Sequence, residues 1–272
     1  MAQLSIEPNP RVRFRMRHED ADLLVVEKPP HVVSTPGLGH ERDSLLSGLF
    51  VEYGTRLQNL GRDRDFGLLH RLDRTTSGLL IVALNGRTYD AMRALFEQRG
   101  IAKFYWAVCA EPPKKPKGVI TRPIAEVTGT AHKARGGEKQ GGNRSLKTAR
   151  ISSAGKPSVT AYRVLQQTPT ATLIECRAVT GRLHQIRVHL ESIGCPILGD
   201  ELYAPEAFRK AAPRLALHAH RLVFAHPVSG ATIDVQTPWP SDLKRLLQKN
   251  HLTRPDLDVK AQTESDADDA SA

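Results

Sequence analysis

The chain has 272 residues, of which 40% are hydrophobic, and its formal net charge is +10. This length is enough for one large folded domain or two small ones. No apolar run approaches the roughly 18 residues that a membrane-spanning helix needs, and residues 1–20 hold no signal-peptide stretch. We therefore expect a cytoplasmic protein without membrane association.

The positive charge favours a polyanionic partner, because Lys and Arg side chains neutralise phosphates and release counterions. Solubility alone is the simpler explanation of the same charge. Cys109, Cys176 and Cys195 are scattered and lack CxxC spacing, which argues against a disulfide framework or a thiolate metal site.

Three regions are expected: an N-terminal extension over residues 1–16, one folded domain over residues 17–250, and an acidic tail over residues 251–272. Residues 255–272 carry six acidic side chains against the single cation Lys260 and almost no large apolar residue. Such a segment cannot offset the entropy of ordering, so we expect it to be disordered.

Within the folded domain, alternating or β-branched apolar runs predict strands, and apolar residues at helical spacing predict helices. The predicted strands cover residues 22–30, 78–84, 101–110, 119–127, 158–166, 171–179, 215–227 and 231–238. The predicted helices run from a cap at Asp43 or Ser44 through Tyr53, from Tyr89 to a stop at Gly100, over residues 181–194, and onward from a cap at Ser241. Mostly antiparallel strands with few helices predict an α+β fold on a mixed sheet with flanking helices.

The stretch 132–156 holds seven Lys or Arg residues and five glycines. This composition is typical of a flexible basic loop rather than of a core element. Such a loop could bind phosphates or simply be solvated.

The densest group of polar residues lies in HRLDRTTSGLL, residues 70–80, where Asp73 stands among arginines. Nearby cations favour an ionised carboxylate, which suits a nucleophile better than a general acid. The alternative is that Asp73 pairs with an arginine or caps a turn, and residue types alone favour this structural role.

A second polar group lies in TGRLHQIRVHL, residues 180–190. On a helix, Leu183, Ile186 and Leu190 would share an apolar face with Arg187 at its edge. A guanidinium drawn inward needs an anionic partner, such as an ionised Asp in a neighbouring loop. Alternatively, Arg187 extends to solvent.

These two segments, together with GCPILGDELYAPEA (194–207), VVEKPPHVVSTPG (25–37), KFY (103–105) and LALHA (215–219), resemble the signature segments of the RluA family of pseudouridine synthases. They follow the family's order over residues 22–240. STPG and GDELYAPEA are most similar to the RluA subgroup itself. The resemblance implies a pseudouridine synthase-like α+β fold with a central RNA-binding cleft.

The resemblance also implies roles for individual residues. Asp73 matches the catalytic aspartate, Arg187 the arginine that pairs with it, and Tyr105 the tyrosine that stacks on the target base. Thr76 and Ser77 would order the loop, and Lys28 belongs to a structural motif beneath it. The residues expected to contact RNA are Arg71, Arg74, Lys103, Arg182, His184, Lys133, Arg135 and Lys147.

Two features depart from the family's pattern. Pro30 and His31 replace a small residue and a glycine, and the basic stretch 132–156 is longer than expected. Both could change the choice of substrate without changing the chemistry.

The implied reaction detaches uracil from ribose and rejoins it through carbon, so no cofactor is expected. Asp73 would act at the anomeric carbon, promote elimination to a glycal, or add to the uracil ring. The sequence holds neither a P-loop nor GxGxxG, and the histidine pairs 184/189 and 218/220 lack ligand geometry or a third ligand, so no metal is expected.

The expected partner is RNA, namely a tRNA anticodon stem-loop, a 23S rRNA loop, or both, with no DNA; the protein is expected to be a monomer. A non-catalytic RNA-binding protein or RNA chaperone is the main alternative. A glycoside hydrolase would need a second carboxylate, and neither Asp63 nor Asp65 sits in a comparable motif.

Overall fold

The computed structural model describes residues 5–130 and 145–255. Lys133, Arg135 and the tail from residue 256 lie outside the described residues, so the predictions for them stay predictions. Among the described residues, no helix combines the length and the hydropathy that crossing a membrane requires.

One mixed sheet of nine strands forms the centre of the fold. Its strands are β1 (Arg15–Glu19), β2 (Leu23–Lys28), β3 (Ser77–Ala83), β4 (Ala102–Cys109), β5 (Lys117–Ile120), β8 (Thr160–Gln167), β9 (Thr172–Ala178), β10 (Leu217–Ala225) and β11 (Thr232–Gln236). Neighbouring strands follow the order β1-β2-β3-β10-β4-β9-β8-β5, and β11 pairs with β10. Only β3 and β10 pair in parallel among these strands, so the predicted mainly antiparallel α+β fold is confirmed.

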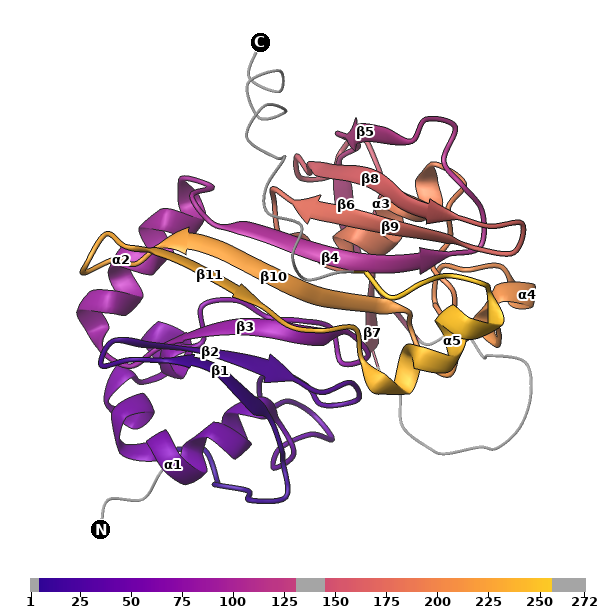
Figure 1. Cartoon of the computed structure of the whole chain (residues 1–272). Coiled ribbons are helices and arrows are strands. Elements are labelled where there is room, and N and C mark those ends of the chain that lie inside the picture. Colours follow the sequence, from indigo (N-terminus) through magenta and orange to yellow (C-terminus); the bar gives the residue numbers. More distant parts are fainter. Residues whose placement is uncertain (1–4, 131–144, 256–272) are drawn as a thin grey trace.

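The helices divide between the two ends of this sheet. They are α1 (Leu45–Leu60), α2 (Gly86–Glu97), α3 (Gln185–Ser192), α4 (Glu206–Arg209) and α5 (Lys244–Lys249), with the 3-10 turns η1 (Arg62–Gly67) and η2 (Ser241–Leu243). Helices α1 and α2 accompany β1 to β3, whereas α3 lies with β8, β9 and the separate hairpin of β6 (Ile124–Thr130) and β7 (Ser145–Ile151) (Figure 1). The strands β10 and β4 therefore join two halves of the molecule.

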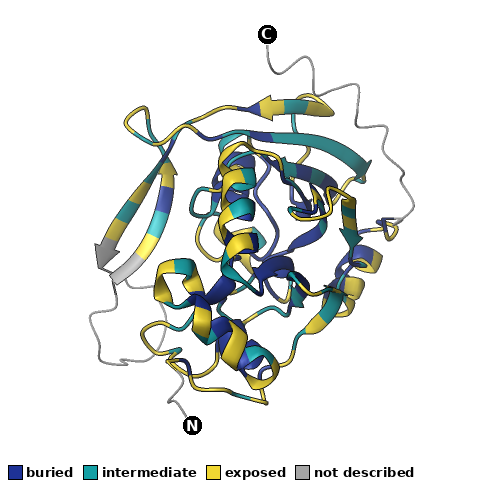
Figure 2. Cartoon of the chain, turned by 90° about the vertical axis from the view of Figure 1, so that its left-hand side faces the viewer, coloured by how far each residue is buried: buried dark blue, intermediate teal, exposed yellow. Residues whose placement is uncertain are grey.

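Helices α1 and α2 carry both buried and exposed residues (Figure 2). Helix α1 starts as predicted at Ser44, whose hydroxyl accepts the N–H of Ser47 at 3.1 Å. It buries Leu49 and Leu57 in the core and continues to Leu60, beyond the predicted end at Tyr53.

Gly78 sets how closely β3 and β10 approach. Its φ is +125°, and a Cβ there would lie 2.2 Å from the carbonyl oxygen of Ala219, its partner in β10. Only glycine allows this contact without displacing a strand. The parallel pairing of Gly78 with Ala219 thus places the end of the Asp73 loop against the centre of the sheet.

Several boundaries differ from prediction. The predicted strand 119–127 is two strands in different sheets, because β5 pairs with β8 and β6 pairs with β7. Residues 145–151 of the predicted flexible loop form β7. The N-terminal residues 5–16 are not a free extension, since Ile6 joins the core and Arg15 pairs with Glu27.

Two helix starts were also wrong. Helix α3 begins at Gln185 rather than near residue 181, because His184 adopts a left-handed conformation with φ 52°. Ser241 does not cap the last helix with its side chain; the segment begins as η2 after Pro240.

Candidate active site

The loop between η1 and β3 carries Asp73 and is held by its own backbone and by the side chain of Ser34. The carbonyl of Asp73 accepts the N–H of Thr76 at 3.1 Å. The buried hydroxyl of Ser34 accepts the N–H of Leu72 at 3.1 Å and donates to its carbonyl at 2.9 Å. The main chain on both sides of Asp73 is therefore fixed before any substrate contact is made.

Lys28 supports this loop from below, at the end of β2. It is fully buried, and its Nζ donates to the carbonyls of Pro29 at 2.9 Å, Val32 at 2.7 Å and Arg74 at 3.4 Å. Burial lowers the pKa of Lys28 to about 7, against the opposing charge of Asp73. Three carbonyl acceptors match the three donors of an ammonium group, so the charged form of Lys28 would be fully hydrogen-bonded beneath the loop.

Arg214 ties the far end of the loop to the sheet. Its guanidinium donates to the carbonyl of Thr75 at 3.4 Å and to Oγ of Ser77 at 3.0 Å, and that oxygen also bonds to Nδ1 of His218 at 2.9 Å. Ser77 therefore orders the loop, as expected, but through Arg214 and His218, which are distant in sequence, rather than through local hydrogen bonds. Thr76 orders the loop only through its backbone N–H. Its buried hydroxyl has no hydrogen-bond partner among the described residues.

Arg187 connects two carboxylates from different segments. Its Nη1 donates to Oδ2 of Asp73 at 3.1 Å, while Nε and Nη2 donate to the two oxygens of Asp200 at 2.8 and 2.7 Å. Burial lowers the pKa of Arg187, but the hydrogen bonds and negative charges of Asp200, and to a smaller extent those of Asp73, raise it overall. The pairing of Arg187 with an acid is confirmed, and its extension to solvent is wrong.

Asp200 was missed by the sequence reasoning, although GDELY was among the resembling segments. It is buried, and its Oδ1 also accepts the N–H groups of Leu202 and Tyr203 at 3.0 and 3.2 Å. One carboxylate thus fixes both the guanidinium and the turn that carries Tyr203. No spacing pattern in the sequence links one arginine to two acids in different segments, so the role of Asp200 could not be predicted from the sequence.

Tyr105 and Lys103 enter the same region from β4, two residues apart and therefore on one face of the strand. Burial, and then the charge of Asp73, raise the pKa of Tyr105, so its hydroxyl stays protonated at neutral pH. Lys103 is 9% exposed and has no acidic partner among the described residues; its Nζ lies 5.1 Å from the ring centre of Phe96. Burial lowers its pKa to about 8.

A cleft of about 1700 Å³ brings these groups together between the two halves of the fold. The described residues predicted for catalysis or RNA contact all line it: Asp73, Tyr105, Arg187, Arg71, Arg74, Lys103, Arg182, His184 and Lys147. Arg62, Arg93 and Arg99 line it too and were not predicted. Two of the arginines that line the cleft also form hydrogen bonds within the protein. Arg74 donates to the carbonyl of His31, and Arg182 donates to the carbonyl of Pro157.

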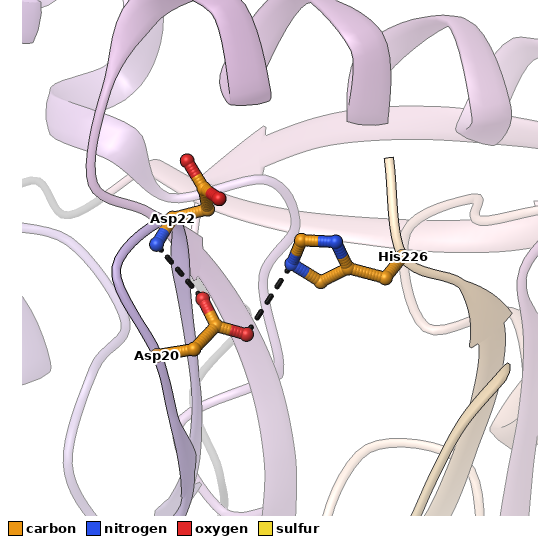
Figure 3. Close-up of side chains that lie close together, drawn as sticks. All are labelled: Asp20, Asp22 and His226. Atoms are coloured by element: carbon orange, nitrogen blue, oxygen red, sulfur yellow. Dashed lines mark hydrogen bonds and ion pairs between the residues drawn. The ribbon is translucent and has the colours of Figure 1, made fainter. Parts of the chain in front are cut away.

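Asp20, Asp22 and His226 form a cluster outside this cleft with the residue types of a metal site (Figure 3). Nδ1 of His226 accepts the N–H groups of Val228 and Ser229, so Nε2 carries the hydrogen and faces Oδ2 of Asp20 at 3.3 Å. Oδ1 of Asp20 accepts the N–H of Asp22. These atoms hold two turns together, and the imidazole offers no lone pair to a metal.

Comparison with known proteins gives the class of this chain. The model of the RNA pseudouridylate synthase family matches residues 22–192. Ribosomal large subunit pseudouridine synthase D of Zymomonas mobilis is 35% identical over 237 residues, covering 85% of this chain and 70% of that protein. The uncharacterized RNA pseudouridine synthase YlyB of Bacillus subtilis is 34% identical over 233 residues, covering 85% and 71%.

Among solved structures, human RNA pseudouridylate synthase domain containing 4 matches with a TM-score of 0.65 and 25% identity, covering 89% of this chain and 94% of that one. The chain belongs to the RNA pseudouridylate synthase family. It is an RluA-family enzyme, an isomerase whose substrate is RNA.

Proposed function

We propose that this protein isomerises uridines in structured RNA to pseudouridine with Asp73 as its catalytic carboxylate. The observation that carries the proposal is the pairing of Asp73 with the buried Arg187 at 3.1 Å, inside the cleft that Tyr105 also lines. A carboxylate of fixed position with a free edge is what attack on, or elimination from, a ribose requires.

The two oxygens of Asp73 differ in their surroundings. Oδ2 accepts from Arg187 and faces Nε2 of His184 at 3.8 Å. Oδ1 has no hydrogen-bond partner among the described side chains and backbone groups, so we assign it as the reacting oxygen. In the overall reaction the C1′–N1 bond breaks, a C1′–C5 bond forms, and a proton leaves C5 while N1 gains one, so no external oxidant or reductant enters.

Tyr105 would stack on the uracil, and its protonated hydroxyl would take part in the proton transfer. Access needs the uridine to leave its stack, which costs a few kcal/mol and least in a loop. A stem-loop is therefore a better substrate than a regular duplex, whose grooves hide the base. The cationic rim residues Arg71, Arg74, Arg182 and Lys147, with Lys103 deeper in, would hold the phosphates, and His184 would line the cleft beside Asp73.

As substrates we propose an anticodon stem-loop of tRNA and a similar loop of 23S rRNA, as the resemblance to the RluA subgroup implies; a single site in one of these RNAs is the alternative. Relatives named ribosomal large subunit pseudouridine synthase D support an rRNA target. We expect the protein to act as a monomer in the cytoplasm.

The decisive test compares Asp73→Asn with the wild type on total RNA from cells that lack the gene. Pseudouridine should form at specific uridines with the wild type and at none of them with Asp73→Asn. Both proteins should bind the target stem-loop with similar affinity. Equal binding with no product from either protein would favour the RNA chaperone instead. Product from Asp73→Asn would overturn the assignment of Asp73.

A further inference from the structure

A chain of contacts links the β6–β7 hairpin to the catalytic carboxylate. The N–H of Ala149 in β7 donates to Oη of Tyr203 at 2.8 Å, and that oxygen lies 2.7 Å from Nδ1 of His184. The other nitrogen of the same ring, Nε2, lies 3.8 Å from Oδ2 of Asp73. Sequence reasoning gave no role to Tyr203.

Hydrogen counting favours one assignment of donors along this chain. A tyrosine hydroxyl carries one hydrogen, and Oη of Tyr203 already accepts the N–H of Ala149, so its own hydrogen is free for Nδ1 of His184. Nδ1 is then the acceptor, and the neutral ring carries its hydrogen on Nε2. The carboxylate of Asp73 facing Nε2 favours the same tautomer.

We propose that Tyr203 is a positioning residue that locks His184 in the tautomer whose Nε2–H points at Asp73. This inference rests on the proposed catalytic role of Asp73. The 3.8 Å separation is longer than a hydrogen bond, so the N–H acts as a directed dipole that can close on Oδ2 when RNA fills the cleft. The opposite tautomer would aim a lone pair at the carboxylate and push it away from its position.

The backbone around His184 is built for this orientation. His184 adopts φ 52° immediately before α3, a conformation that non-glycine residues rarely take and that is usually kept for a reason. Its side chain is 12% exposed, and burial lowers its pKa despite the charge of Asp73, so the ring is neutral. Tyr203 is held in turn by Asp200 through its backbone.

The β6–β7 hairpin packs against the residues that position His184. Ile124 and Ala149 form a small core with Val188 of α3, against which Leu183 and Tyr203 pack. Lys147 and Glu126 of the same hairpin line the cleft. RNA that contacts these residues would therefore press on the segment that holds Tyr203.

The first test reads the tautomer directly in the full-length protein, with histidines labelled by ¹⁵N and their two-bond couplings measured by NMR. The wild type should show a hydrogen on Nε2 of His184. Tyr203→Phe should shift the ring toward the other tautomer. A wild-type ring with its hydrogen on Nδ1 would overturn the proposal, whatever the enzyme does with RNA.

The second test uses single-turnover rates on the modified stem-loop. Loss of one hydrogen bond should slow Tyr203→Phe by roughly 3- to 10-fold while the Kd for RNA changes little. Tyr53→Phe is the matched control, because it removes a hydroxyl that bonds Glu19 at 2.8 Å outside the cleft; its rate should equal that of the wild type.

A double-mutant cycle separates positioning from packing. His184→Gln keeps an N–H donor but has no tautomers, so Tyr203→Phe should cost little in that background. The same loss of rate in both backgrounds, or no loss in either, would refute the tautomer role. If the wild type itself forms no pseudouridine, the proposed function fails. The NMR measurement still shows independently whether Tyr203 sets the tautomer of His184.

Discussion

Arg187 and Asp200 form a two-pronged ion pair that is almost completely buried, with side chains 5% and 1% exposed. Both oxygens of Asp200 bond the guanidinium, so its third nitrogen, Nη1, is aimed at Asp73. The orientation of the Asp73–Arg187 pair therefore depends on a second carboxylate that does not line the cleft.

We predict that Asp200→Asn strongly destabilises the protein, because it leaves the charge of Arg187 short of a partner. Removing one member of a buried pair costs about 3–5 kcal/mol, which urea unfolding would measure. Asp234→Asn is the control: its pair with Arg221 is more exposed, and about 1 kcal/mol or less should be lost. Equal losses in the two variants would contradict the importance of burial.

Tyr105→Phe tests which part of the tyrosine matters. The ring should still stack on the base, so RNA affinity should stay near the wild-type value. Without the protonated hydroxyl, we expect the single-turnover rate to fall about 100-fold. Tyr105→Leu should lose affinity as well as rate; a Phe variant with the full rate would limit Tyr105 to stacking.

Lys103 is a buried cation that faces the cleft without an acidic partner among the described residues, which suits a phosphate. Lys103→Gln should weaken RNA binding and lower the slope of log affinity against log salt by about 1. The exposed Lys114, which does not line the cleft, is the control for the same charge change.

Because burial lowers the pKa of Lys103 to about 8, wild-type affinity should also fall as the pH rises from 7 to 9. Lys103→Gln should lose much of this dependence. An identical pH dependence of binding in the variant would show that Lys103 does not hold the phosphate.

Acid should unfold the protein through its buried histidines. His218 is fully buried, and burial holds its pKa well below the ordinary 6.5. Below pH 6.5 the unfolded chain binds a proton that the folded one does not, so stability is complete above that pH and declines below it. Each such histidine contributes about 1.4 kcal/mol per pH unit; His218→Gln should make the free energy of unfolding depend less steeply on pH between 6.5 and 5.

The sequence predicted those parts of the fold and site that depend on local patterns. The buried strand β3, the cap at Ser44 and the hairpin of β8 and β9 followed from apolar spacing and turn residues, whereas helical spacing placed Arg187 only at the edge of an apolar face. These features are set by neighbours a few residues apart.

What could not be predicted depends on contacts between distant segments. The split of residues 119–127 between two sheets follows from which strands pair, and β7 follows from its docking on α3. Asp200 and Tyr203 act through Arg187 and His184, which lie near them only in the fold. The left-handed conformation of His184 makes α3 start later than predicted, and no residue pattern in this segment signals that conformation.

The parallel contact of β3 with β10 also sets the order in which the site can be completed during synthesis. Ser77 and His218, which bond across this contact, are separated by 141 positions. The Asp73 loop leaves the ribosome long before the strand that anchors it, and contacts of such separation form slowly. A nascent chain that ends before β10 therefore carries every catalytic side chain proposed above but lacks the anchor at the Ser77 end of the loop.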